Sequence, residues 1–305
     1  MSTDRTSRTS TSTTTTTVRS ADGTPIACST WGSGDPIVII DGATAHRATT
    51  PENAATAELL ADEFLVVNYD RRGRGQSGDT APYAPERELE DLAAVIDQVA
   101  GGSPATTVFA WSSGGNLALN AAQAGVRVAR LALFEPNAVV DDDRPPLPAD
   151  YVARLDDAVA AGRPGDAVAL FLTAAVGLPP DMVAEVRQDP ETWSALEAVA
   201  PTIAYDGRQV GDAMSGRPLR PDLWDRVDVP VLVMHGTGTW PFLASAARAI
   251  SAHLPTATLR PVPGEDHTTT PEVLAAELRA FAGQPSHPQT PHEQPRHEQL
   301  RLEER

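Results

Sequence analysis

Two consecutive serines, Ser112 and Ser113, lie where a strand-like segment meets a helix-like one. Residues 106–111 are apolar and β-branched, two glycines follow the serines, and residues 117–122 have the composition of a helix. A serine in such a sharp turn is held in a strained backbone conformation that exposes its hydroxyl, and small neighbours let the chain turn so tightly. The pattern predicts a nucleophilic hydroxyl at position 112; an ordinary turn with chance serines is the alternative.

The elements that must position this hydroxyl alternate regularly along the chain. Short apolar runs predict strands, and segments with apolar residues at helical spacing predict helices between them. Continuous apolar strands alternating with helices are typical of a parallel sheet covered on both faces. We expect the hairpin at 18–31 and the strands at 36–41, 64–70, 106–111, 129–135, 229–235 and 258–262, with helices at 52–62, 85–100, 242–253 and 272–281 between or after them.

The serine turn, read as Ala110-Trp111-Ser112-Ser113-Gly114, resembles the Gly-x-Ser-x-Gly nucleophile elbow of the α/β-hydrolase superfamily, with alanine in place of the first glycine. This resemblance implies a mostly parallel eight-stranded sheet with helices on both faces and a helical cap after strand 6. It also implies a base in the loop after the last strand, where His267 stands in a G-x-x-H pattern. An exposed loop histidine is the alternative.

The expected position of the triad acid in this chain differs from its position in most relatives. They carry an aspartate after strand 7, in a pattern like H-G-x-x-D, where this chain has Thr239. Glu135 ends the strand that follows the elbow helix, so the two strands form one βαβ unit and Ser112 and Glu135 should emerge side by side. In this arrangement the chain resembles zearalenone lactonases, which have the acid on a glutamate after strand 6 and a Ser-Ser-Gly elbow. A solvent-facing Glu135 is the alternative, and Asp141, Asp142 and Asp143 are reserve candidates for the acid.

The resemblance also implies backbone donors for a developing oxyanion. One is the amide of Ser113, and the second lies in Asp41-Gly42-Ala43, where the family often has His-Gly; we name Ala43, with Gly42 as the neighbouring candidate. Gly42, Trp111 and Trp240 are the candidates for the substrate pocket.

A second glycine motif, Gly73-Arg74-Gly75-Gln76-Ser77-Gly78, fits the dinucleotide-binding pattern G-x-G-x-x-G. That function requires a helix to begin at once at the pyrophosphate, and here prolines at 82 and 85 delay the helix. The segment instead resembles the D-x-R-G-x-G-x-S turn after strand 4 of α/β hydrolases, which predicts a structural role for its arginines.

Composition divides the chain into four regions. We predict a disordered Ser/Thr-rich tail over 1–17, a hydrolase core over 18–140 and 225–282, a helical cap over 141–224 and a disordered tail over 283–305. A metal site at His287, His292 and His297 in that tail is not expected, because five-residue spacing places no two of them on one helical face. Seven apolar cap residues either line the site as a lid or form the cap's own core. They are Leu170, Phe171, Leu172, Val176, Leu178, Met182 and Trp193.

Bulk properties limit the function further. The 305-residue chain has a formal net charge of −17 and no lysine, which argues against nucleic acid and anionic membranes as partners. Its single cysteine, Cys28, excludes an internal disulfide framework and a cysteine zinc site. We therefore predict a cytoplasmic serine hydrolase, without cofactor or metal, that cleaves a small neutral ester or lactone. A ligand-binding relative with little turnover, or a perhydrolase, is the alternative; the sequence predicts no oligomeric state.

Overall fold

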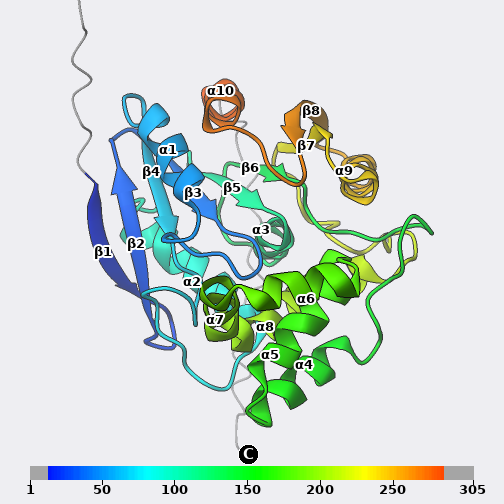
Figure 1. Ribbon diagram of the computed structural model, residues 1–305. Helices are drawn as coiled ribbons and strands as arrows, with labels where there is room; N and C mark the ends of the chain where they lie inside the picture. Colours follow the sequence, from blue (N-terminus) through cyan, green and yellow to red (C-terminus); the bar gives the residue numbers. More distant parts are fainter. Residues whose placement is uncertain (1–12, 285–305) are drawn as a thin grey trace, which may run out of the picture.

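The computed structural model describes residues 13–284, and its strands form one eight-stranded sheet in the order β1-β2-β4-β3-β5-β6-β7-β8 (Figure 1). The strands are β1 (Thr14–Arg19), β2 (Pro25–Trp31), β3 (Asp35–Ile40), β4 (Phe64–Tyr69), β5 (Thr107–Trp111), β6 (Arg130–Phe134), β7 (Val231–Gly238) and β8 (Ala257–Glu265). β2 pairs antiparallel with β1 and β4, and the remaining pairs are parallel. The predicted mostly parallel α/β sheet is confirmed.

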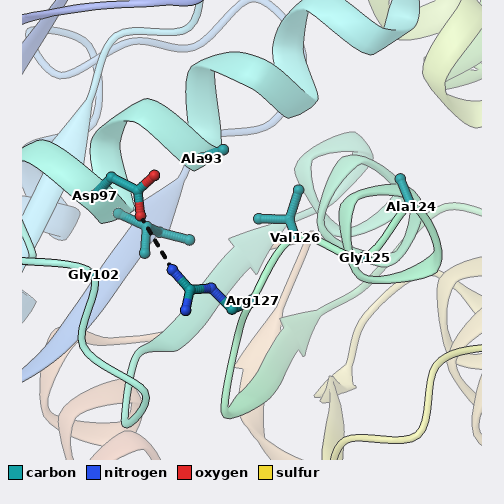
Figure 2. A pocket seen from close by; sticks show the side chains of 8 residues that line it. Ala93, Asp97, Gly102, Ala124, Gly125, Val126 and Arg127 are labelled. Atoms are coloured by element: carbon teal, nitrogen blue, oxygen red, sulfur yellow. Dashed lines mark ion pairs between the residues drawn. The ribbon is translucent and has the colours of Figure 1, made fainter. Parts of the chain in front are cut away.

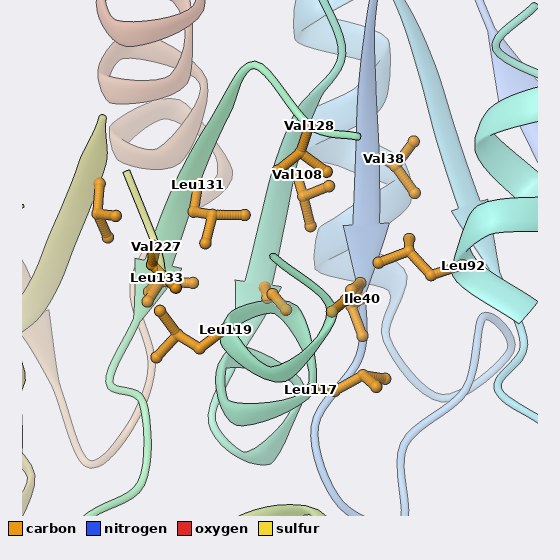
Figure 3. Close-up of a cluster of buried hydrophobic side chains, with 14 of the residues drawn as sticks. Val38, Ile40, Leu92, Val108, Leu117, Leu119, Val128, Leu131, Leu133 and Val227 are labelled. Carbon is orange, nitrogen blue, oxygen red and sulfur yellow. The ribbon is translucent and has the colours of Figure 1, made fainter. Parts of the chain in front are cut away.

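Helices cover both faces because the central strands are apolar on both sides. Ile37 and Ile39 of β3 face α1 (Pro51–Leu60) and α10 (Pro271–Ala282). Val38 and Ile40 face the opposite layer, where leucines of α3 pack over β3, β5 and β6 (Figure 3). That layer contains α2 (Pro85–Gln98), α3 (Ser113–Gln123) and α9 (Pro241–His253). No helix within residues 13–284 is long and apolar enough to cross a bilayer.

A helical block lies between β6 and β7 in the chain and packs at one side of the sheet (Figure 1). Its elements are α4 (Tyr151–Ala160), α5 (Pro164–Leu170), the π-helix η1 (Phe171–Val176), α6 (Pro180–Gln188), α7 (Pro190–Val199), η2 (Ala200–Thr202), α8 (Ile203–Val210) and η3 (Gly211–Met214). Six of the seven proposed lid residues belong to this block's own apolar cluster or pack against it, and Met182 is 48% exposed. These six residues therefore fit the alternative in which they form the cap's own core better than the one in which they form a lid over the site.

The predicted N-terminal tail is wrong over residues 14–17. These threonines form most of β1 and pair residue by residue with β2, as in Thr14 with Thr30 and Thr17 with Ala27. Threonine favours the pleated, half-exposed surface of an edge strand, so a run that lacks large apolar residues still extends the sheet. Residues 1–12 and 285–305, including His287, His292 and His297, lie outside the described residues. Gln284, also assigned to a tail, accepts a hydrogen bond from Arg130 at 2.6 Å.

Candidate functional site

Ser112 occupies a strained turn between β5 and α3. Its backbone has φ 51° and ψ −125°, a conformation that L-residues rarely adopt, and its amide donates to the carbonyl of Phe134 at 2.9 Å. The turn also brings α3 very close to β3. A Cβ at Gly114 would lie 2.7 Å from the carbonyl oxygen of Asp41 and 2.9 Å from that of Ile40, so glycine is required there. Close packing therefore holds the strained serine in place.

Glu135 and His267 meet at the same edge of the sheet. Glu135 follows β6 directly, is fully buried and has φ 49°, while His267 lies between β8 and α10 with φ 63°. One carboxylate oxygen of Glu135 contacts Nδ1 of His267, and the other accepts from the amide of Gly236 at 2.8 Å. A carboxylate accepts hydrogen bonds, so we assign the imidazole proton to Nδ1, which leaves Nε2 free to act as a base.

The hydroxyl of Ser112 points to a different partner, Asn137, whose Oδ1 accepts from it at 3.2 Å. Within residues 13–284, no hydrogen bond joins Ser112 Oγ and His267. Rotation about χ1 redirects a serine hydroxyl, and catalytic hydrogen bonds of unliganded enzymes often form only with substrate. The structure thus brings His267 and Glu135 together and leaves the serine hydroxyl turned toward Asn137.

Sequence reasoning missed Asn137. It lies two residues beyond Glu135, and Asn116 of α3 fixes its backbone by donating to its carbonyl at 2.9 Å and accepting from its amide at 3.1 Å. A polar residue just after a strand that carries the proposed acid is a weak signal that could have pointed to it.

The other acid candidates lie in different surroundings. Asp141, Asp142 and Asp143 are exposed, and Asp141 accepts from the hydroxyl of Ser245 at 2.6 Å. Thr239 stands at the position of the aspartate expected from most relatives, and its hydroxyl is buried with no hydrogen-bond partner in the described part of the chain. None of these side chains has a hydrogen bond to His267 within residues 13–284, whereas Glu135 has one.

The loop after β3 passes beside the elbow. A Cβ at Gly42 would lie 3.1 Å from the Cβ of Ser112, so this segment contacts the serine directly. Ala43 follows, and neither its amide nor that of Ser113 donates a hydrogen bond within residues 13–284. Two free amides beside a strained serine are what a developing oxyanion requires.

Asp41, where relatives often carry histidine, turns away from this loop into the protein. Its carboxylate accepts from Asn53 at 2.6 Å and from Asn68 at 3.3 Å, and the residue is 1% exposed. Burial raises the pKa of Asp41 to about 6, against the opposing effect of the side-chain hydrogen bonds. The residue therefore anchors the loop from beneath.

This raised pKa predicts that stability decreases as the pH rises. With a pKa raised from 3.8 to about 6, the folded protein keeps a proton that the unfolded chain has lost. Stability falls wherever the folded state binds more protons, here between about pH 4 and pH 6, by up to about 3 kcal/mol. In urea unfolding, Asp41→Asn should lose less stability across this window than the unsubstituted protein. Equal losses in both proteins would contradict the assignment.

The two candidate pocket tryptophans differ in their surroundings. Trp111 donates through Nε1 to Asn53 at 2.9 Å and packs edge-on against Phe109 and Phe134, so it belongs to the packing between the sheet and α1. The ring of Trp240 stacks on the imidazole of His267, with centroids 6.1 Å apart and planes 24° apart. Trp240 therefore lies beside the proposed base, and Trp111 lies on the α1 side of the sheet.

A cavity of about 270 Å³ lies elsewhere, between α2 and the turn that precedes β6 (Figure 2). Its lining includes the ion pair of Asp97 and Arg127, 4.0 Å apart and largely exposed to solvent. The remaining lining residues are small or aliphatic and include no serine, cysteine or histidine. This cavity lacks the chemistry of the Ser112 edge and is not part of the candidate site.

Comparison with known proteins identifies the class. Residues 37–277 match the model of the alpha/beta hydrolase family. An alpha/beta hydrolase from Sphaerobacter thermophilus DSM 20745 is 46% identical in sequence, with a TM-score of 0.77 and coverage of 87% of this chain and 99% of that chain. The chain belongs to the alpha/beta hydrolase family.

Other solved structures share the fold at lower identity. A thermophilic esterase from Thermogutta terrifontis is 21% identical, with a TM-score of 0.63 and coverage of 88% of this chain and 97% of that chain. The bottromycin epimerase BotH, solved in complex with bottromycin A2, is 25% identical, with a TM-score of 0.59 and coverage of 88% and 98%. Proteins of this fold thus include at least one whose name denotes a reaction other than hydrolysis.

Proposed function

We propose that the protein is a cofactor-free serine hydrolase that cleaves a neutral carboxylic ester or lactone through an acyl-enzyme. The observation that carries this proposal is the contact of the buried Glu135 carboxylate with Nδ1 of His267, at the sheet edge where Ser112 holds its strained turn. A buried carboxylate that orients an imidazole near a partly buried serine is the arrangement that activates a hydroxyl for acyl transfer.

In the proposed mechanism the Ser112 hydroxyl leaves Asn137 and turns to Nε2 of His267. Ser112 Oγ attacks the ester carbonyl while Nε2 takes its proton, and Glu135 stabilises the imidazolium through Nδ1. The amides of Ala43 and Ser113 receive the developing oxyanion. The imidazolium protonates the leaving alcohol, and the same base then activates the water that hydrolyses the acyl-enzyme.

Charges around the oxyanion loop support a neutral substrate. The nearby arginines are already paired, Arg71 with Glu88 at 2.7 Å and Arg74 with Asp206. A carboxylate on the substrate would compete with these buried ion pairs. An anionic ester is therefore expected to bind more weakly than its neutral analogue.

A ligand-binding relative with little turnover is the second candidate function. The orientation of the Ser112 hydroxyl toward Asn137, at 3.2 Å, favours it, because a binding protein has no need of a serine–histidine contact. Perhydrolase activity would use the same three residues with peroxide in place of water.

Turnover of a small panel separates these functions. We expect hydrolysis of neutral p-nitrophenyl esters and of simple lactones, with a lower kcat/KM for p-nitrophenyl esters that carry a terminal carboxylate. Binding of the same esters without release of p-nitrophenol would support the ligand-binding function. Faster release with hydrogen peroxide than with water would support perhydrolysis.

A further inference from the structure

A buried carboxylate of the cap contacts Ser113 directly and reaches the loop after β3, which carries the other proposed oxyanion donor, through an arginine. Asp206 of α8 is 4% exposed and accepts from the hydroxyl of Ser113 and from Nη1 of Arg71, each at 2.7 Å. Its second oxygen contacts Nη2 of Arg74. Burial raises the pKa of Asp206, but the two arginine charges and the Ser113 hydroxyl hold it below its ordinary value. The carboxylate therefore stays charged and accepts all three bonds.

Arg74 extends this contact to the loop after β3. The residue is 1% exposed, and its Nη1 donates to the carbonyl of Gly42 at 2.6 Å while Nε donates to Thr202 at 2.9 Å. In a trans peptide the C=O and the following N–H point in opposite directions within one plane. Fixing the Gly42 carbonyl therefore sets the direction of the Ala43 amide.

Ser113 is fixed by a separate bond. It is the first residue of α3, is 1% exposed, and has its hydroxyl on Asp206. Its amide is one of the unpaired donors at a helix N-terminus. A side chain held by Asp206 restricts rotation of this residue and so restricts the direction of its amide.

We propose that Asp206 and Arg74 are positioning residues that align the Ala43 and Ser113 amides for the oxyanion. Because Asp206 belongs to cap helix α8, this alignment depends on the position of α8 against the core. The inference rests on the proposed function. The sequence pattern of the G-x-G turn predicted a structural role for Arg74, and the inference gives this residue a role in the reaction. Arg72, in the same turn, serves the fold: it pairs with Asp91 at 2.7 Å and with Asp22 at 3.0 Å and contacts neither donor segment.

Arg74→Lys tests the contact that fixes the Gly42 carbonyl, and Ser113→Ala tests the contact that fixes Ser113. Arg72→Lys is the matched control. A lysine ammonium at position 74 is a single compact charge without the planar fork that lets the guanidinium reach Asp206, Thr202 and the Gly42 carbonyl at once. It is drawn to the Asp206 charge, which releases the Gly42 carbonyl. Ser113→Ala removes one side-chain bond and keeps the amide. Since loss of a whole oxyanion donor lowers kcat about 10²–10³-fold, misalignment should lower it about tenfold, with KM nearly unchanged.

The readout is the ratio of turnover of a p-nitrophenyl ester to that of its thionoester, in which sulfur replaces the carbonyl oxygen. Sulfur accepts hydrogen bonds weakly, so aligned donors favour the oxygen ester and misaligned donors lower the ratio. We expect a lower ratio for Arg74→Lys and Ser113→Ala and an unchanged ratio for Arg72→Lys. An unchanged ratio in both test variants, or in folded Ser113→Ala if Arg74→Lys fails to fold, overturns the inference alone. An unsubstituted protein without Ser112-dependent turnover overturns the proposed function as well.

Discussion

Replacing Glu135 with glutamine is expected to lower kcat about 10³–10⁴-fold while the protein stays folded. The glutamine oxygen must accept from the amide of Gly236, which donates to Glu135 at 2.8 Å, because two facing donors would be costly in a buried position. The glutamine NH₂ then faces Nδ1 of His267 and requires that nitrogen to accept. The imidazole proton moves to Nε2, which can no longer take a proton from Ser112.

Asp142→Asn is the control for this prediction. Asp142 is exposed, belongs to the reserve acid candidates and has no hydrogen bond to His267 within residues 13–284, so its substitution should leave kcat and KM unchanged. Steady-state kinetics on one neutral p-nitrophenyl ester compares the two variants, and circular dichroism verifies their folding. A harmless Glu135→Gln together with an inactive Asp142→Asn would assign the acid to the loop after β6 and overturn our choice.

Ser112→Ala is expected to lower kcat/KM about 10⁴–10⁶-fold, since loss of the nucleophile removes the acyl-enzyme route entirely. Alanine keeps the Cβ that packs near Gly42 and loses the hydroxyl that donates to Asn137. The thermal midpoint should therefore change by no more than a few degrees, as for a loss of about 1 kcal/mol.

Asn137→Ala provides the comparison for Ser112→Ala. It removes the resting partner of the Ser112 hydroxyl, at 3.2 Å, without touching the nucleophile, and should retain most of the turnover. Residual activity of Ser112→Ala within tenfold of the unsubstituted protein would mean that another residue carries the reaction.

The sequence was sufficient for features that depend on local pattern and strand order. Continuous apolar runs such as 36–41 and 129–135 predicted buried parallel strands, which became β3 and β6. The position of Glu135 followed from strand adjacency, because β6 pairs directly with the strand that leads to Ser112. The meeting of Glu135 and His267 was predictable for the same reason: both follow parallel strands at one edge of the sheet.

Features that depend on long-range packing were beyond the sequence. Asp206 contacts Ser113 across 93 residues, and the contact depends on how α8 sits against α3. Nothing in the sequence around Asp41 indicates that its buried carboxylate accepts from Asn53 and Asn68. The threonines of β1 looked like a low-complexity tail because nothing in their own composition indicates the β2 partner that orders them.

The central claim, that Ser112 is a nucleophile activated by His267, is tested most directly by mapping the adduct of a fluorophosphonate probe by peptide mass spectrometry. We expect one phosphonyl group per chain, on the hydroxyl of Ser112, formed rapidly by the unsubstituted protein and at least about 10²-fold more slowly by His267→Ala. Labelling at Ser113 or another residue, or equal labelling rates in the two proteins, would contradict the account.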